Sequence, residues 1–98
     1  METVFEKVKK AVGASDAFFD DQVKDAILSA IADMKRNAVI IPNEKITEAE
    51  TLGDPLLDRA VILFCRSEFN YDGEAERYRR AYDYTLCSLS LSEGYHDE

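Results

Sequence analysis

Histidine and cysteine, the residues that most often carry enzyme chemistry, are scarce in this chain of 98 residues. The single histidine, His96, stands close to the C-terminus. A general acid or base needs a fixed orientation and a second group that holds it, and a chain end supplies neither. Cys65 follows Leu63 and Phe64, which indicates a buried thiol rather than a nucleophile with a lowered pKa. We therefore expect neither residue to be catalytic.

Metal, cofactor and paired-carboxylate sites are not indicated either. Cys65 and Cys87 are far apart, with no further Cys or His at ligand spacing, so a zinc site lacks the three or four ligands that it needs. Adjacent carboxylates such as Asp20 and Asp21 stand where a helix is expected to begin, and there they complement the helix dipole. The glycines are scattered singly, so no phosphate-binding loop is present. The sequence predicts no enzyme, no metal site and no cofactor.

The composition is typical of a small soluble domain. Twelve Lys and Arg residues oppose 20 Asp and Glu residues, a net charge of −8, which disfavours an open DNA-binding surface. Leu, Ile, Val and Phe make up about a quarter of the chain, too much for a disordered protein. No apolar run approaches the ~18 residues that span a bilayer, and the N-terminus lacks a signal-peptide stretch. We expect one soluble, cytoplasmic domain over residues 1–98.

The spacing of apolar residues predicts four amphipathic helices and no pair of strands. The expected helices cover residues 2–12, 16–37, 55–69 and 73–90. Ser15 or Asp16 can cap the second helix, and Asp72 can cap the fourth. Asp54 followed by Pro55 is a strong start for the third helix, because a proline there loses no intrahelical hydrogen bond. The sequence thus predicts an all-α fold, a small four-helix bundle.

The apolar faces of these helices predict the core. The third helix is apolar on most of its faces, which indicates a central position or burial against a neighbouring subunit. Phe19 and Val23 begin the inner face of the second helix. The expected core consists of Val8, Val23, Ile27, Ile31, Val61, Phe64, Tyr78, Tyr82 and Leu86.

Two segments fall outside the helical pattern: the long loop over residues 39–53, between the second and third helices, and the C-terminal tail, residues 91–98. Neither has the apolar periodicity that would dock it onto the bundle, so both are expected to be mobile in an isolated subunit. Each still carries a few apolar groups, such as Ile46 and Tyr95. Such groups suit a segment that becomes ordered on binding a partner.

With no chemistry indicated, an interaction role is the leading hypothesis. The loop is acidic, the fourth helix carries a cluster of arginines, and these opposite charges can pair within one subunit or across two. Tyrosines away from the inner stripe suit a protein interface, although half-buried tyrosines without any such role are equally common. The candidate interface residues are Glu44, Glu48, Glu50, Tyr71, Arg77, Arg79, Arg80, Tyr84, Leu91 and Tyr95.

The order of several segments resembles a known family. An acidic helix start, an apolar helix led by Asp-Pro, a Glu-Arg-Tyr helix and a Leu-Ser-rich ending follow one another over nearly the whole chain. They are Ala17-Phe18-Phe19-Asp20-Asp21-Gln22-Val23, Asp54-Pro55-Leu56-Leu57-Asp58-Arg59-Ala60, Glu76-Arg77-Tyr78-Arg79-Arg80-Ala81-Tyr82 and Leu89-Ser90-Leu91-Ser92-Glu93-Gly94-Tyr95. In this respect the chain resembles the head-tail connector proteins of long-tailed bacteriophages and prophages, also described as DNA-packaging or head-completion adaptors.

The resemblance implies a small helical protein without catalytic residues or cofactor. Its copies, roughly a dozen, would form a ring at the head-tail junction of the virion, after assembly in the cytoplasm of the bacterial host. The ring would contact the portal protein and the stopper or tail-completion protein, with the tail on the portal and the loop facing the channel or the stopper. DNA would pass through without specific binding, and an acidic channel wall suits this because it does not hold phosphate groups.

A small acidic helical regulator that binds a basic protein, or a nucleic-acid mimic, is the alternative. Mimics display acidic groups at regular spacing on one face, and Asp20, Asp21, Asp25 and Asp33 only partly do so. A regulator would bind one basic protein as a monomer or dimer, whereas a connector would form large rings or bind a portal.

Overall fold

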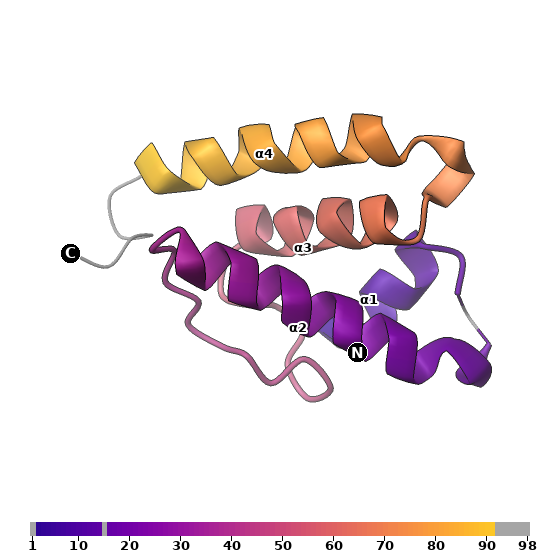
Figure 1. The fold of residues 1–98 in the computed structure, drawn as a ribbon. Helices are drawn as coiled ribbons and strands as arrows, with labels where there is room; N and C mark the ends of the chain where they lie inside the picture. Colours follow the sequence, from indigo (N-terminus) through magenta and orange to yellow (C-terminus); the bar gives the residue numbers. More distant parts are fainter. Residues whose placement is uncertain (1, 15, 92–98) are drawn as a thin grey trace.

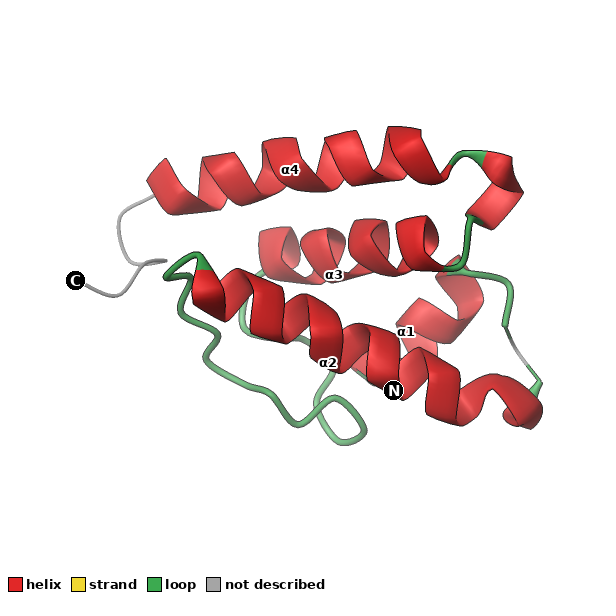
Figure 2. Cartoon of the chain, in the orientation of Figure 1, coloured by secondary structure: helices red, strands yellow, loops and turns green. Residues whose placement is uncertain are grey.

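The computed structural model describes residues 2–14 and 16–91, and this part of the chain contains helices and loops but no strand (Figure 2). Within it lie α1 (Val4–Ala11), a 3-10 turn η1 (Ala17–Phe19), α2 (Asp20–Arg36), α3 (Pro55–Glu68), a 3-10 turn η2 (Tyr71–Gly73) and α4 (Ala75–Leu91). The predicted all-α class and the long loop between the second and third helices are confirmed. The expected tail lies, from residue 92 onward, outside the described residues.

Local chemistry explains where α1 and α3 begin. The Thr3 hydroxyl accepts a hydrogen bond from the Glu6 N–H at 3.3 Å, and the Glu6 carboxylate accepts one from the Thr3 N–H at 3.1 Å. This reciprocal pair satisfies N–H groups at the helix start that have no partner inside the helix. The Asp54 carboxylate accepts a hydrogen bond from the Leu56 N–H at 2.7 Å, and Pro55 takes the first helical position. The predicted start of α3 is therefore confirmed.

The predicted starts of the second and fourth helices are wrong. Asp16 caps the turn η1, where its carboxylate accepts a hydrogen bond from the Phe18 N–H at 2.9 Å, and α2 begins only after that turn. Asp72 has a φ of 56°, in the left-handed region, and the Asn70 side chain instead accepts a hydrogen bond from the Ala75 N–H at 3.1 Å. In both places a short turn precedes the helix. Residue type alone does not decide whether an Asp or Asn caps the turn or the helix that follows it.

The central element of the fold is α3, which packs against α1, α2 and α4 and lies between α2 and α4 (Figure 1). This confirms the position predicted from its nearly all-round apolar surface. The predicted core residues that are buried are Val8, Val23, Ile27, Ile31, Val61, Phe64 and Tyr82. Tyr78 and Leu86 are only partly buried, at the edge of the core, because α4 packs chiefly on one neighbour, α3.

The loop between α2 and α3 is docked on the bundle, so the expectation that it would not dock there is wrong. Its carbonyl groups accept hydrogen bonds from the start of α1: the Val4 N–H bonds to Ala49 at 2.8 Å, and the Phe5 N–H to Ile46 at 2.9 Å. These N–H groups have no partner inside α1, so the loop completes that helix. The loop also adds four buried side chains to the core: Val39, Ile41, Ile46 and Leu52.

Gly53 allows a close approach at the end of this loop. Its φ of 129° lies in the region that favours glycine, and a Cβ at this position would lie 2.6 Å from Cγ of Pro42. No L-residue with a side chain fits that space, so glycine is needed where the chain turns toward α3.

Candidate functional site

The two cysteines occupy different environments. Cys65 is buried in α3, and burial, aided by the nearby Glu68 carboxylate, raises the pKa of its thiol to about 12. A thiol of this kind is protonated at neutral pH and is a poor nucleophile, which agrees with the core role expected from the sequence. Cys87 is exposed on α4. His96 lies outside the described residues, and among the described ones no three His, Cys, Asp or Glu side chains gather as metal ligands.

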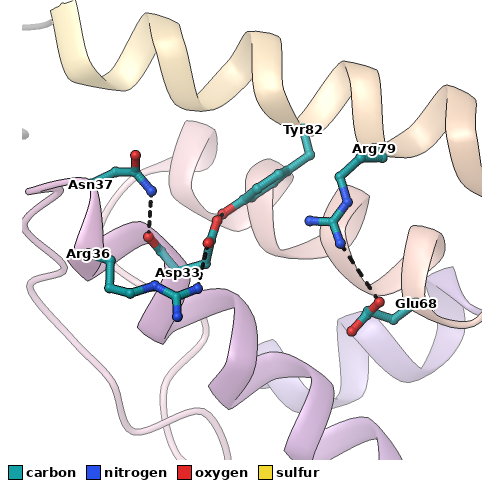
Figure 3. Close-up of polar contacts among 6 residues, drawn as sticks. All are labelled: Asp33, Arg36, Asn37, Glu68, Arg79 and Tyr82. Atoms are coloured by element: carbon teal, nitrogen blue, oxygen red, sulfur yellow. Dashed lines mark hydrogen bonds and ion pairs between the residues drawn. The ribbon is translucent and has the colours of Figure 1, made fainter.

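A polar link connects α2 to α4 beside the core (Figure 3). The buried Tyr82 donates a hydrogen bond from its hydroxyl to the Asp33 carboxylate at 2.6 Å, and Arg36 contacts the same carboxylate at 2.8 Å. Burial by itself would raise the pKa of Asp33, but the bonds from Tyr82 and Arg36 outweigh it and the pKa is lowered. Burial and the negative charge of Asp33 raise the pKa of Tyr82. The link therefore joins a charged carboxylate to a neutral phenol at neutral pH.

We expect Tyr82→Phe to lower the free energy of unfolding at pH 7 by about 1.5–3 kcal/mol, because it removes a hydrogen bond to a charged group. The pKa of Asp33 is lower in the folded protein, so the carboxylate stabilises the fold above the unfolded value of about 3.9. That contribution is lost as the pH falls through the folded pKa. The difference between wild type and variant should therefore shrink as the pH falls from 7 to below about 3.9, measured by urea unfolding.

The matched control is Tyr84→Phe, which removes the same hydroxyl from a tyrosine that is 78% exposed. Its effect on the free energy of unfolding should stay within about 0.5 kcal/mol. An undiminished Tyr82→Phe effect at low pH would mean that the Asp33 charge does not strengthen this bond.

The arginine cluster of α4 is neutralised locally. Arg77 contacts Glu74 at 2.7 Å, Arg80 contacts Glu76 at 3.4 Å and Arg79 contacts Glu68 at 3.9 Å. Arg79 also lies over the ring of Phe64, 4.9 Å from its centroid, and so has a structural role (Figure 3 shows its pair with Glu68). Exposed ion pairs of this kind are weak. Arg77 and Arg80, whose side chains are each 76% exposed, therefore remain available to a partner.

The acids of the loop lie apart from these arginines. Glu44 pairs with Lys35 of α2 at 2.9 Å, and Glu48 and Glu50 are exposed. The described residues show no ion pair between the loop and the arginine cluster, so any pairing of the two would have to join different copies of the chain.

The tyrosine and tail candidates are only partly described. Tyr84 is exposed on α4, as the sequence indicated. The side chains of Tyr71 and Leu91, and the whole of Tyr95, lie outside the described part of the structure. These three stay predictions.

Sequence reasoning missed an exposed aromatic pair at the start of α2. Phe18 is 79% exposed and Phe19 37% exposed, and their rings meet edge to face with centroids 5.3 Å apart. The assignment of Phe19 to the inner face of α2 is wrong, because it belongs to the turn η1 and not to the helix. The signal was present in the sequence: two adjacent aromatics cannot both point to one face of a helix.

Among the described residues, no helix combines the length and the apolar composition that crossing a bilayer requires. Comparison with known proteins gave one family match. The model of a family described as phage connector protein matches residues 4–96, a span that includes all four helices. No curated protein and no solved structure gave a match. The match confirms the resemblance seen in the order of the sequence segments, and the chain belongs to the phage connector protein family.

Proposed function

We propose that this protein is a head-tail connector subunit whose copies form a ring between the portal and the stopper or tail-completion protein. The observation that carries the proposal is the family match over residues 4–96, which spans the whole helical bundle rather than one segment of it. A connector of this family is a structural component of the phage particle. The ring, its partners and its assembly in the host cytoplasm are the parts of the proposal that experiment must test.

The surface of the bundle supports this role physically. A subunit of a closed ring needs two different faces that complement each other, so that each copy can contact the next by a rotation. The exposed acids of the loop lie on one part of the chain, and the arginines of α4, each beside an acid of its own, lie on another. The net charge of −8 per copy suits a channel wall that DNA must slide past.

Electron microscopy of the purified full chain, alone and mixed with the portal protein of the same phage, tests the proposal. We expect closed rings with a central opening, either free at high concentration or bound to the portal. A chain that stays monomeric and does not bind the portal contradicts the proposal. Tight binding of such a monomer to one basic protein would instead support an acidic regulator.

Within the ring, we propose that the loop acids Glu44, Glu48 and Glu50 of one copy face the arginine cluster of the next. Arg80→Glu should then raise the concentration of half-assembly about threefold to tenfold, since it replaces an attraction by a repulsion. Analytical ultracentrifugation measures this concentration. The matched control is Lys10→Glu, because Lys10 is 73% exposed and, like Arg80, pairs with one exposed acid. Equal assembly of both variants would show that the arginines do not face the loop.

A further inference from the structure

The corner between α1 and α2 presents an aromatic and acidic projection. It consists of Phe18 and Phe19, flanked by the exposed carboxylates of Asp16 and Asp21, and we call it the aromatic corner. Phe18 is 79% exposed in its own chain. Aromatic side chains bury a large area when they find a partner and are enriched at protein interfaces. An open phenylalanine pair within an acidic setting therefore indicates a contact with an apolar, basic surface.

A surface of that kind lies on the same molecule, in a groove of about 490 Å³ between α1 and α3. Its apolar lining, which we call the floor, consists of Pro55, Ile62 and Leu63. Its charged lining, which we call the rim, is basic although the chain carries a net charge of −8. Three cations oppose the single carboxylate of Asp58, and they are Lys7, Arg59 and Arg66. We call this the α1–α3 groove.

The charged groups of the rim differ in the partners that they already have within the chain. Asp58 already accepts a hydrogen bond from the Leu52 N–H at 2.8 Å, and the Arg66 side chain donates to the Ala11 carbonyl at 2.9 Å. Arg59 is exposed and forms no ion pair with any described residue. It is therefore the cation of the groove best placed to meet an acid from another molecule.

We infer that the aromatic corner of one copy docks into the α1–α3 groove of the next, with Phe18 on the apolar floor and Asp16 or Asp21 near Arg59. This inference rests on the proposed ring and names a contact that holds it together. The occupant is a second copy, because the corner carries both features that the groove complements: an exposed aromatic ring and surplus negative charge. A contact between two different patches of one chain is the heterologous kind that closes into a ring.

The two proposed contacts use neighbouring parts of the fold. Figure 1 shows η1, which carries the aromatic corner, at the same end of the bundle as the start of α4 and its arginines. The acidic loop adjoins the groove, because the Lys7 side chain on its rim donates a hydrogen bond to the Glu50 carbonyl. The aromatic corner and the arginines therefore share one end of the bundle, and the basic groove adjoins the acidic loop. Opposite charges at both proposed contacts would favour this alignment of neighbouring copies.

Photo-crosslinking locates the contact directly. The full chain is prepared with p-benzoylphenylalanine in place of Phe18, mixed with isotopically labelled wild type, assembled and irradiated. We expect crosslinks between copies that map by mass spectrometry to residues 55–66 of α3 or to Lys7. Crosslinks from assembled rings to another surface, or none at all, overturn the inference.

Substitutions measure how much the contact contributes. Phe18→Ala should raise the concentration of half-assembly about tenfold or more, as expected for an interface anchor. Leu28→Ala, at a site 51% exposed on α2 outside the aromatic corner, should change it by less than about twofold. Arg59→Glu should also weaken assembly, whereas Lys10→Glu, the same charge change at an exposed residue that does not line the groove, should not. Circular dichroism melting checks that each variant folds.

The outcomes separate this inference from the proposed function. If wild type forms rings and Phe18→Ala forms them equally well, the docking is wrong while the connector role stands. If wild type forms no rings, alone or on the portal, both are wrong.

Discussion

Phe64→Ala is expected to lower the free energy of unfolding by about 3–5 kcal/mol, the largest effect among single substitutions considered for this bundle. Phe64 lies in the central helix, is 6% exposed, and meets Tyr82 edge to face with ring centroids 5.2 Å apart. Its removal takes a large ring out of the core and leaves a cavity that the neighbouring helices cannot fill. It also removes the ring over which Arg79 lies.

Urea unfolding followed by circular dichroism measures this change, and the melting temperature should fall by about 12 °C or more for a domain of this size. Tyr84→Ala is the matched control, since it removes a large aromatic side chain that is 78% exposed. That control should change the free energy of unfolding by no more than about 0.5 kcal/mol. A Phe64→Ala variant as stable as the control would contradict the central place given to α3.

Leu52→Ala is expected to cost about 2–5 kcal/mol, although Leu52 belongs to a loop. Its side chain is 0% exposed, and its backbone carbonyl accepts a hydrogen bond from the Asn43 N–H at 3.1 Å. The loop therefore contributes to the core as a helix does. Ile40→Ala in the same loop, at a site 43% exposed, should cost less than about 1 kcal/mol by comparison.

Hydrogen exchange adds a second measurement for the loop. The amides of Val4 and Phe5 bond to carbonyl groups of the loop, so they should exchange slowly in wild type and faster in Leu52→Ala. Wild-type stability of Leu52→Ala, together with fast exchange of both amides in wild type, would mean that the loop is not docked in solution.

A docked loop changes how the acidic residues act in the proposed ring. A segment held by buried side chains presents Glu44, Glu48 and Glu50 from a fixed backbone, so little conformational entropy is lost when a neighbour binds. The sequence interpretation, in which the loop becomes ordered only on assembly, required that loss. Charge pairs from a preordered loop therefore favour assembly more strongly than pairs from a mobile one would.

The order of the helices and the family were determined by the sequence alone. The Asp54 carboxylate accepts a hydrogen bond from an N–H group of the first turn of α3, and Pro55 has no N–H group that needs a partner. Both effects are local, so no distant residue is needed to begin this helix. Helical periodicity is also local, so the apolar stripes of α2 and α3 correctly predicted that Val23, Ile27 and Val61 lie in the core.

Only the tertiary structure decided which residues outside the helices are buried and which surfaces are open to a partner. Val39, Ile41, Ile46 and Leu52 belong to no helix, and they are buried because the loop folds back onto the bundle, where its carbonyls bond to the start of α1. Phe18 and Phe19 became exposed because a 3-10 turn rotates them off the inner face of α2. The α1–α3 groove brings together Lys7 and Arg59, which are far apart in the sequence. Period and residue type describe neighbours along the chain, whereas a docked loop, an exposed corner and a groove arise from helices that meet in space.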